Sequence, residues 1–210
     1  MSELYTLMKE YVQKGSTVLD IGANVGNVAC AFAALGADVY AFEPQPNIYA
    51  TLKRDVPGNV QVENLAVGAA NDEISFYLDM RDGMQGVASS MMVLDDLKQA
   101  NKIKEIRVRC VRLDDYVLAH GLRPDFIKID VEGCEPDVFE GGIETIRSFR
   151  PVMFFEFWEC HLPRYERWFE ILSELYTLIR IPGRQEVREF YRLNQNPNGN
   201  IDILCVPKIS

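Results

Sequence analysis

Hydrophobic residues recur along this chain with two spacings, one typical of helices and one typical of strands. Between Leu4 and Val12 they return at steps of three and four, which predicts an amphipathic helix within 1–15 that Gly15 ends. Short apolar runs then alternate with helical segments. We predict strands at 17–21, 38–42 and 60–63, and helices at 28–35 and 47–55. This alternation indicates parallel strands joined by right-handed crossovers.

The middle of the chain departs from the alternation of strands and helices. Residues 73–79 and 106–110 alternate apolar and polar side chains, which predicts two half-exposed strands paired antiparallel as an inserted hairpin. Residues 80–104 between them are rich in Gly, Ser, Met and Asp. Such a segment favours a mobile lid over a site.

The second half returns to strands and helices, without a sign of a second domain, so we expect one domain over 1–210. Pro136 suits the first turn of a helix, which we expect the pair Gly141 and Gly142 to interrupt. The other elements predicted here are helices at 113–120 and 164–176, and strands at 126–130, 151–157, 177–181 and 201–206.

Composition narrows the choice of partners and compartment. The chain has 210 residues and a formal net charge of −9, which is poorly suited to a polyanion, so we expect no nucleic-acid partner. Its five cysteines are odd in number and form no C-x-x-C pair, which indicates free thiols in a reducing compartment. Neither a signal peptide nor a membrane-length apolar run is visible. We therefore expect a cytoplasmic protein without a membrane partner.

The stretch V-L-D-I-G-A-N-V-G-N at 18–27 carries the first functional signal. It predicts a buried strand that ends in a tight turn and opens a helix, as in nucleotide-binding proteins. A dinucleotide fingerprint would place glycines at 22, 24 and 27, but Asn24 and Asn27 occupy two of these positions. The carboxylate of Asp20 would also repel a phosphate. A nicotinamide-dependent oxidoreductase is thus disfavoured, and there is no P-loop motif.

The same carboxylate suits a ligand that carries an ammonium and a sulfonium, and S-adenosylmethionine carries both. Its ribose needs an acid, and Glu43 lies 21 residues after Gly22 (43 − 22), near the spacing of about 20 seen for ribose-binding acids. A third acid, Asp130, ends the strand at 126–130. A strand–glycine–helix turn can also be topology alone. A catalytically silent cofactor-binding or scaffold protein is therefore the alternative.

Several motifs in order resemble the FkbM family of S-adenosylmethionine-dependent methyltransferases. They are V-L-D-I-G-A-N-V-G, A-F-E-P, N-L-A-V-G, R-L-D-D-Y, D-F-I-K-I-D-V-E-G-C-E and R-P-V-M-F-F-E, and they span 18–156. The resemblance implies a three-layer, Rossmann-like α/β fold of class I, with a seven-stranded, mostly parallel sheet whose last strand is antiparallel. It also implies methyl transfer, usually to a hydroxyl oxygen of a sugar or natural-product scaffold. Asn24 departs from the class, where glycine is common.

The resemblance and the strand ends together assign the cofactor site. The first turn should approach the methionine end, with Asp20 binding its ammonium directly or through water. Glu43 should take the ribose hydroxyls, and the segment after the third strand should lie along the adenine. The full predicted cofactor set is Asp20, Gly22, Ala23, Asn24, Gly26, Asn27, Glu43, Pro44, Asn64, Leu65, Ala66, Asp130 and Val131.

The catalytic assignment leaves alternatives open. Asp130 could complete the cofactor pocket or act as general base on the acceptor hydroxyl, and His161 could be the base instead. Glu132 could be catalytic or could cap the turn before Gly133. Asp130, Glu132 and Glu156 could together hold Mg²⁺, but no spacing demands it, and we assign no metal.

The acceptor itself is not specified by these motifs. We expect a small molecule, a sugar or a hydroxylated metabolite, and assign Ser90, Glu156 and Trp158 to its binding. The oligomeric state is left open, with a homodimer as one option.

Overall fold

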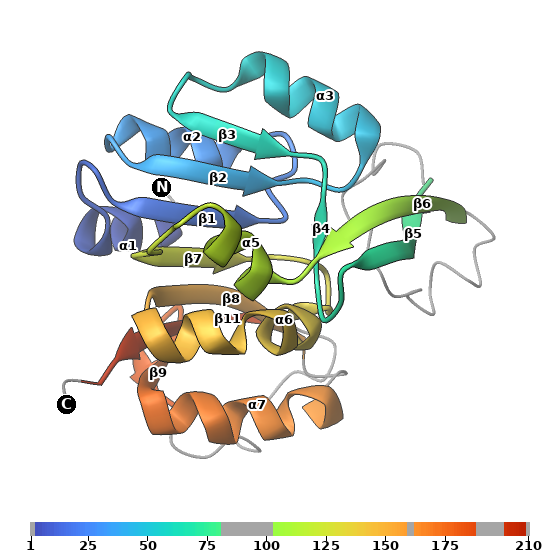
Figure 1. Cartoon of the computed structure of the whole chain (residues 1–210). Coiled ribbons are helices and arrows are strands. Elements are labelled where there is room, and N and C mark those ends of the chain that lie inside the picture. Colours follow the sequence, from blue (N-terminus) through green and yellow to red (C-terminus); the bar gives the residue numbers. More distant parts are fainter. Residues whose placement is uncertain (1–2, 81–102, 159–161, 188–199, 209–210) are drawn as a thin grey trace.

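The computed structural model describes residues 3–80, 103–158, 162–187 and 200–208. Helices and strands alternate through most of the chain (Figure 1). The helices are α1 (Glu3–Tyr11), α2 (Asn27–Ala34), α3 (Pro46–Asp55), α5 (Leu113–Ala119), α6 (Glu135–Phe149) and α7 (Leu162–Leu175). The strands are β1 (Thr17–Ile21), β2 (Asp38–Phe42), β3 (Val60–Glu63), β4 (Ala66–Val67), β5 (Asp72–Asp79), β6 (Ile103–Val111), β7 (Phe126–Ile129), β8 (Val152–Trp158), β9 (Tyr176–Ile181), β10 (Gln185–Glu186) and β11 (Asn200–Pro207).

The main sheet has the strand order β10-β9-β11-β8-β7-β1-β2-β3. Strands β3, β2, β1, β7 and β8 pair in parallel. The last strand, β11, lies between β8 and β9 and is antiparallel to both. This confirms the expected seven strands with an antiparallel last one. The two-residue β10, antiparallel to β9, is an eighth strand that the sequence did not predict. Both of its residues are exposed, so they leave no alternating pattern.

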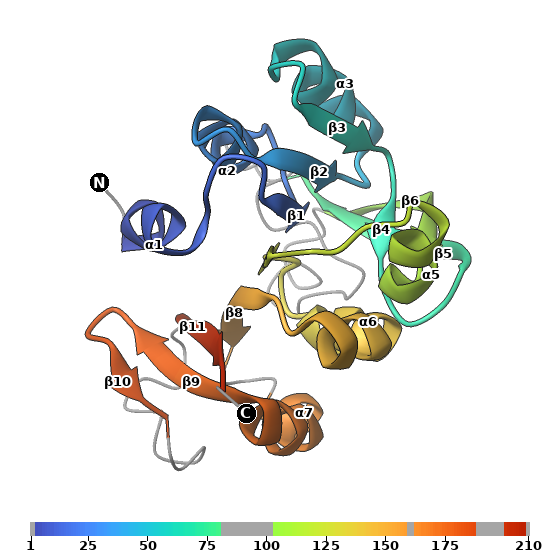
Figure 2. The same ribbon diagram turned by 60° about the vertical axis from the view of Figure 1, so that its left-hand side comes forward.

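Two hydrophobic cores lie on the two faces of this sheet and make the three expected layers (Figure 2). Helices α1, α2 and α3 cover one face, and α5, α6 and α7 cover the other. Side chains alternate between the faces along each strand. In β1, for example, Val18 belongs to the core under α1 and α2, while Leu19 belongs to the core under α5 and α6.

The predicted hairpin is present, with β5 and β6 paired antiparallel. The short β4 joins β6 in parallel and gives a small second sheet, β4-β6-β5. Ala66, Phe76, Val108 and Cys110 form its own apolar cluster. Residues 81–102, which make up most of the predicted lid, lie outside the described residues. The lid therefore stays a prediction.

The expected interruption of α6 at Gly141 and Gly142 is wrong, because the helix continues through both to Phe149. A Cβ atom at Gly141 would lie 1.9 Å from the carbonyl oxygen of Gly68, just after β4. A Cβ atom at Gly142 would lie 2.9 Å from Cδ2 of Leu113 at the start of α5. The two glycines thus permit close packing of neighbouring elements. They do so at a cost in helix propensity of about 1 kcal/mol each.

Within the described ranges, no helix combines the length and apolar character that crossing a bilayer requires. Cys30, Cys110, Cys134 and Cys205 are free thiols, which agrees with the predicted absence of a disulfide frame among them. Cys160 lies outside the described residues.

The close approach at Gly141 predicts a large loss of stability for Gly141→Ala. The added methyl group would force the Gly68 backbone away from α6, so we expect a loss of about 2 kcal/mol or more in the free energy of unfolding, measured with urea. Gly58→Ala is the control, because a Cβ atom there meets nothing within 4 Å. Equal stability of the two variants would contradict the close approach.

Candidate active site

The carboxyl ends of β1, β2 and β7 meet at one edge of the main sheet. Strand β1 has β2 on one side and β7 on the other, so the order reverses here, where ligands bind in open α/β sheets. A cavity lies at this point. Its lining includes nine predicted site residues, namely Gly22, Asn24, Glu43, Pro44, Leu65, Ala66, Asp130, Val131 and Glu132. It also includes Ile21, Phe42, Gln45, Val67 and Phe76, which the sequence reasoning did not name.

The turn after β1 follows a path that needs positive φ angles. Gly22 has φ 80°, Asn24 has φ 51° and Gly26 has φ 89°. Position 22 also requires glycine because a Cβ atom there would lie 1.8 Å from the carbonyl oxygen of Asp130. The backbone N–H groups of Gly22 and Ala23 donate to the Phe42 carbonyl, at 3.1 and 2.9 Å. The turn is therefore anchored to the end of β2. Asn27 begins α2 directly after it.

Glu43 braces this turn from the end of β2. Its side chain is 4% exposed, and its carboxylate accepts hydrogen bonds from the backbone N–H groups of Asn24 (3.0 Å) and Gln45 (2.8 Å). Burial raises the pKa of Glu43 to about 7, although these two hydrogen bonds act in the opposite direction. A carboxylate has about four lone-pair sites, so capacity remains for two hydroxyl donors from a ligand.

Asn64 also braces the backbone. Its amide donates to the carbonyl oxygens of Glu43 (2.9 Å) and Pro44 (3.0 Å). Its side chain therefore fixes the edge that Glu43 occupies, while its neighbours Leu65 and Ala66 line the cavity.

Asp20 is not part of the cavity lining, and its side chain is 0% exposed. Its neighbour across the β1–β7 pairing is Lys128, whose Nζ lies 3.2 Å from Asp20 Oδ1. The same ammonium donates to the Gly22 carbonyl oxygen (2.8 Å) and lies 3.3 Å from Asp130 Oδ2. Although burial opposes its charge, the two carboxylates raise the pKa of Lys128.

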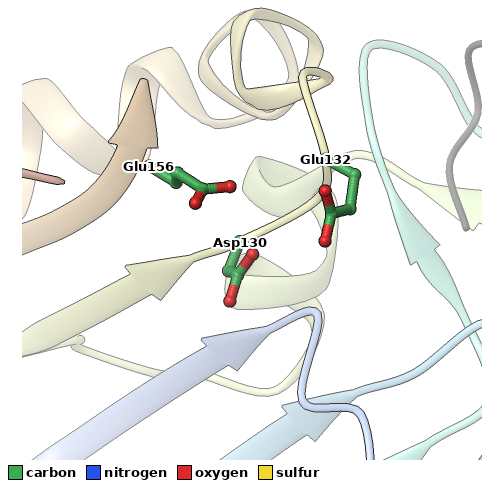
Figure 3. Close-up of side chains that lie close together, drawn as sticks. All are labelled: Asp130, Glu132 and Glu156. Atoms are coloured by element: carbon green, nitrogen blue, oxygen red, sulfur yellow. The ribbon is translucent and has the colours of Figure 1, made fainter. Parts of the chain in front are cut away.

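Three carboxylates converge beside the cavity, two of them from the loop after β7 and the third from β8 (Figure 3). Asp130, Glu132 and Glu156 each offer an oxygen, and these oxygens all lie within 4.8 Å of one another. Burial, followed by the charges of Asp130, Glu156 and Glu135, raises the pKa of Glu132 to about 8. Glu132 therefore holds a proton in most molecules at pH 7. The three oxygens are close enough together to hold a cation, which the sequence left as an option, and we assign no ion to them.

The turn after β7 is capped by Glu135, a residue that the sequence reasoning missed. Its buried carboxylate accepts hydrogen bonds from the backbone N–H groups of Val131 (3.1 Å) and Gly133 (3.4 Å), and from the hydroxyl of Tyr165. Burial raises its pKa to about 6. The capping role considered for Glu132 thus belongs to Glu135. The acid at the end of D-V-E-G-C-E was the available signal.

A second cavity opens beside the first, on the face that carries α1 and α2. Asp130 lines both cavities, and Lys128 lines the second. Two further acids line it, Glu156 of β8 and Asp202 of β11, which are opposite each other in the β8–β11 register. The rest of the lining is apolar and consists of Leu4, Val28, Ile129, Phe154, Ile181 and Pro182. The sequence reasoning assigned Glu156 here but did not find Asp202, because β11 reaches β8 only through the fold.

Three predicted residues are not placed by this geometry. Ser90 and His161 lie outside the described residues. Trp158 ends β8, and its side chain is likewise outside the described part of the chain. Their roles stay predictions.

The strand order, the antiparallel β11 and the cavity at the reversal point define a class I, Rossmann-like methyltransferase fold. Within this class, the chain belongs to the FkbM methyltransferase family, since the model of the Methyltransferase FkbM domain matches residues 20–192. This confirms the resemblance seen in the motifs.

Two curated relatives are named as methyltransferases, and one of the two names gives a sugar acid as the substrate. The 2-O-methyltransferase NoeI of Sinorhizobium fredii is 31% identical over 148 residues, which cover 63% of this chain and 60% of that protein. The hexuronic acid methyltransferase AglP of Haloferax volcanii is 23% identical over 150 residues, or 70% of this chain and 58% of that protein. The alignment thus spans about three fifths of each curated relative.

Solved structures share the fold at low identity. The methyltransferase FkbM from Methylobacillus flagellatus has a TM-score of 0.56 and 14% identity, covering 95% of this chain and 50% of that chain. A putative rRNA methylase from Clostridium thermocellum has a TM-score of 0.58 and 14% identity, covering 99% of this chain and 94% of that chain. At such identities the likeness concerns the fold alone.

The capping role of Glu135 predicts that Glu135→Ala destabilises the protein. The change leaves the Tyr165 hydroxyl and the backbone N–H of Val131 without their acceptor, so we expect a loss of about 2–4 kcal/mol in the free energy of unfolding. Urea unfolding measures this loss. Glu170→Ala, at an exposed site on α7, is the control and should change stability by less than about 0.5 kcal/mol. Similar values for both variants would rule out the cap.

Proposed function

We propose that this chain is an S-adenosylmethionine-dependent O-methyltransferase that acts on a hydroxyl of a sugar or small natural-product scaffold. One observation carries the proposal. Asp130 lines both cavities, so a single carboxylate lies between the space suited to the methyl donor and a neighbouring space suited to an acceptor. Membership of the FkbM family and the names of NoeI and AglP support the reaction and the acceptor class.

The residues that line the first cavity are of types that suit the parts of S-adenosylmethionine. In the turn after β1, Gly22 and Asn24 line the cavity where the methionine end would lie, and Ala23, Gly26 and Asn27 complete the turn. Glu43 retains acceptor capacity for two ribose hydroxyls, with Pro44 beside it. The apolar residues Phe42, Leu65, Ala66, Val67 and Phe76 suit an adenine ring. When bound, the cofactor supplies a methyl group on a positively charged sulfur.

The chain supplies position and a proton acceptor. With the methyl donor bound, Asp130 would accept the proton that the acceptor hydroxyl loses when its oxygen takes the methyl group. The Asp130 side chain is 45% exposed, so it is accessible from the cavity, while Lys128 holds its Oδ2. Glu132, with its raised pKa of about 8, is mostly protonated at pH 7 and is a poorer base there.

The state of Glu43 makes cofactor affinity depend on pH. Its pKa of about 7 means that acid adds a proton to the carboxylate that should accept the ribose hydroxyls. We expect the Kd for S-adenosylhomocysteine, measured by calorimetry, to rise about tenfold from pH 8 to pH 6. Glu43→Gln should bind weakly and lose most of this dependence. A variant with unchanged affinity would disprove the ribose role.

Replacement of the base should affect turnover more than cofactor binding. For Asp130→Asn we expect kcat to fall about 10²-fold or more, because the variant cannot accept the proton, while the Kd for S-adenosylhomocysteine changes less than about threefold. Transfer of labelled methyl groups from S-adenosylmethionine into host extract measures turnover, and identification of the labelled product reveals the acceptor.

His161→Ala provides the comparison for Asp130→Asn. A loss with His161→Ala that exceeds the loss with Asp130→Asn would move the role of base to His161. Failure of the unaltered protein to bind S-adenosylhomocysteine would contradict the proposed function. A chain that binds it but labels nothing would instead support the silent cofactor-binding alternative.

A further inference from the structure

The proposed mechanism assigns no role to the buried ammonium group of Lys128. Lys128 lies in β7 with its side chain 5% exposed, and its Nζ has three partners. They are Asp20 Oδ1 at 3.2 Å, the Gly22 carbonyl oxygen at 2.8 Å and Asp130 Oδ2 at 3.3 Å. The contact with the Gly22 carbonyl oxygen is a hydrogen bond, and the contacts with the two carboxylates are ion pairs.

Core stability alone does not explain this arrangement. Removal of an ion from water costs several kcal/mol, and apolar side chains of similar size often stabilise a core as well as a buried ion pair does. On the other side of β7, Lys128 pairs with Phe154 of β8, which belongs to the apolar core on the same face of the sheet. This face therefore accepts an apolar side chain. An ammonium at 128 therefore points to a role that a methyl group could not fill.

The three partners belong to different parts of the proposed reaction. Gly22 begins the turn that would hold the methionine end, and Asp130 is the proposed proton acceptor. Asp20 anchors the ammonium from β1, at the position that the β1–β7 register places beside Lys128. The ammonium thus connects the donor side of the site to the acceptor side across two neighbouring strands.

We propose that Lys128 is a positioning residue that fixes the Asp130 carboxylate relative to the cofactor turn. The inference rests on the proposed function, because it assigns Lys128 an effect on turnover that acts through Asp130. In-line transfer requires the acceptor oxygen, methyl group and sulfur to be aligned. A displacement of about 1 Å in such an arrangement can lower the rate about 10²-fold.

A direct Lys128→Met change would leave the carboxylate of Asp20, which is 0% exposed, without its partner and could unfold the chain. The test therefore uses Asp20→Asn as a common background, which removes this buried charge. Four proteins are compared. The first carries Asp20→Asn alone, the second adds Lys128→Met, the third adds Asp130→Asn instead, and the fourth adds both changes. Each is assayed by incorporation of labelled methyl groups at saturating host extract, across a range of S-adenosylmethionine concentrations.

We expect Lys128→Met to lower kcat about 10- to 100-fold when Asp130 is present, with KM for S-adenosylmethionine changed less than about threefold. When Asp130 is already Asn, the same change should lower kcat less than about threefold, because a residue that acts through Asp130 has nothing left to position. An equal loss in both backgrounds would overturn the proposal and show that Lys128 is only structural. A rise in KM at constant kcat would also overturn it.

Lys14→Met in the same background is the control, since Lys14 is an exposed lysine before the start of β1, at the opposite end of that strand from Gly22, and should leave kcat unchanged. If Asp20→Asn lowers the melting temperature below the assay temperature, Lys128→Arg in the unaltered chain replaces Lys128→Met. It keeps the charge but changes the geometry, and we expect the same dependence on Asp130. If the Asp20→Asn and unaltered proteins neither bind S-adenosylhomocysteine nor transfer a label, the proposed function itself fails. An equal loss of kcat with and without Asp130 would instead contradict only the role of Lys128.

Discussion

The ion pair between Lys128 and Asp20 is the constraint on which the centre of this sheet depends. Both side chains lie on the face that α1 and α2 cover, and the β1–β7 pairing places them side by side. A shift of one residue in this pairing would turn Lys128 toward the apolar core under α5 and α6. The cost of an unpaired charge there is several kcal/mol. The ion pair therefore favours the same register as the apolar residues of β1 and β7, and that register brings Gly22 and Asp130 together.

The rest of the site is held by side chains that contact the backbone more than one another. Glu43 accepts from Asn24 and Gln45, Asn64 donates to the carbonyl groups at the end of β2, and Glu135 caps the turn after β7. Such contacts position loops whose own side chains stay available to a ligand. Rigid surroundings of this kind reduce the conformational freedom that a bound ligand would otherwise have to remove.

Sequence patterns predicted the parallel order, the hairpin and most of the first cavity, because each depends on local periodicity or on a residue directly after a strand. Strands β4 and β10 were missed, since two residues cannot show a period. Asp202 was missed because its place beside Glu156 depends on β11 entering between β8 and β9. The pair Gly141 and Gly142 was misread as a helix break. Glycine in a sequence marks either a turn or a close contact, and only the neighbours decide which.

That close contact also helps to fix the position of β4, which lines the first cavity. Gly68 follows β4 directly, and Ala66 and Val67 of β4 line the cavity on their way to it. The backbone of Gly68 lies against Gly141 of α6. A larger side chain at Gly141 would therefore displace β4 and with it part of the cavity wall, although no residue of α6 lines the cavity.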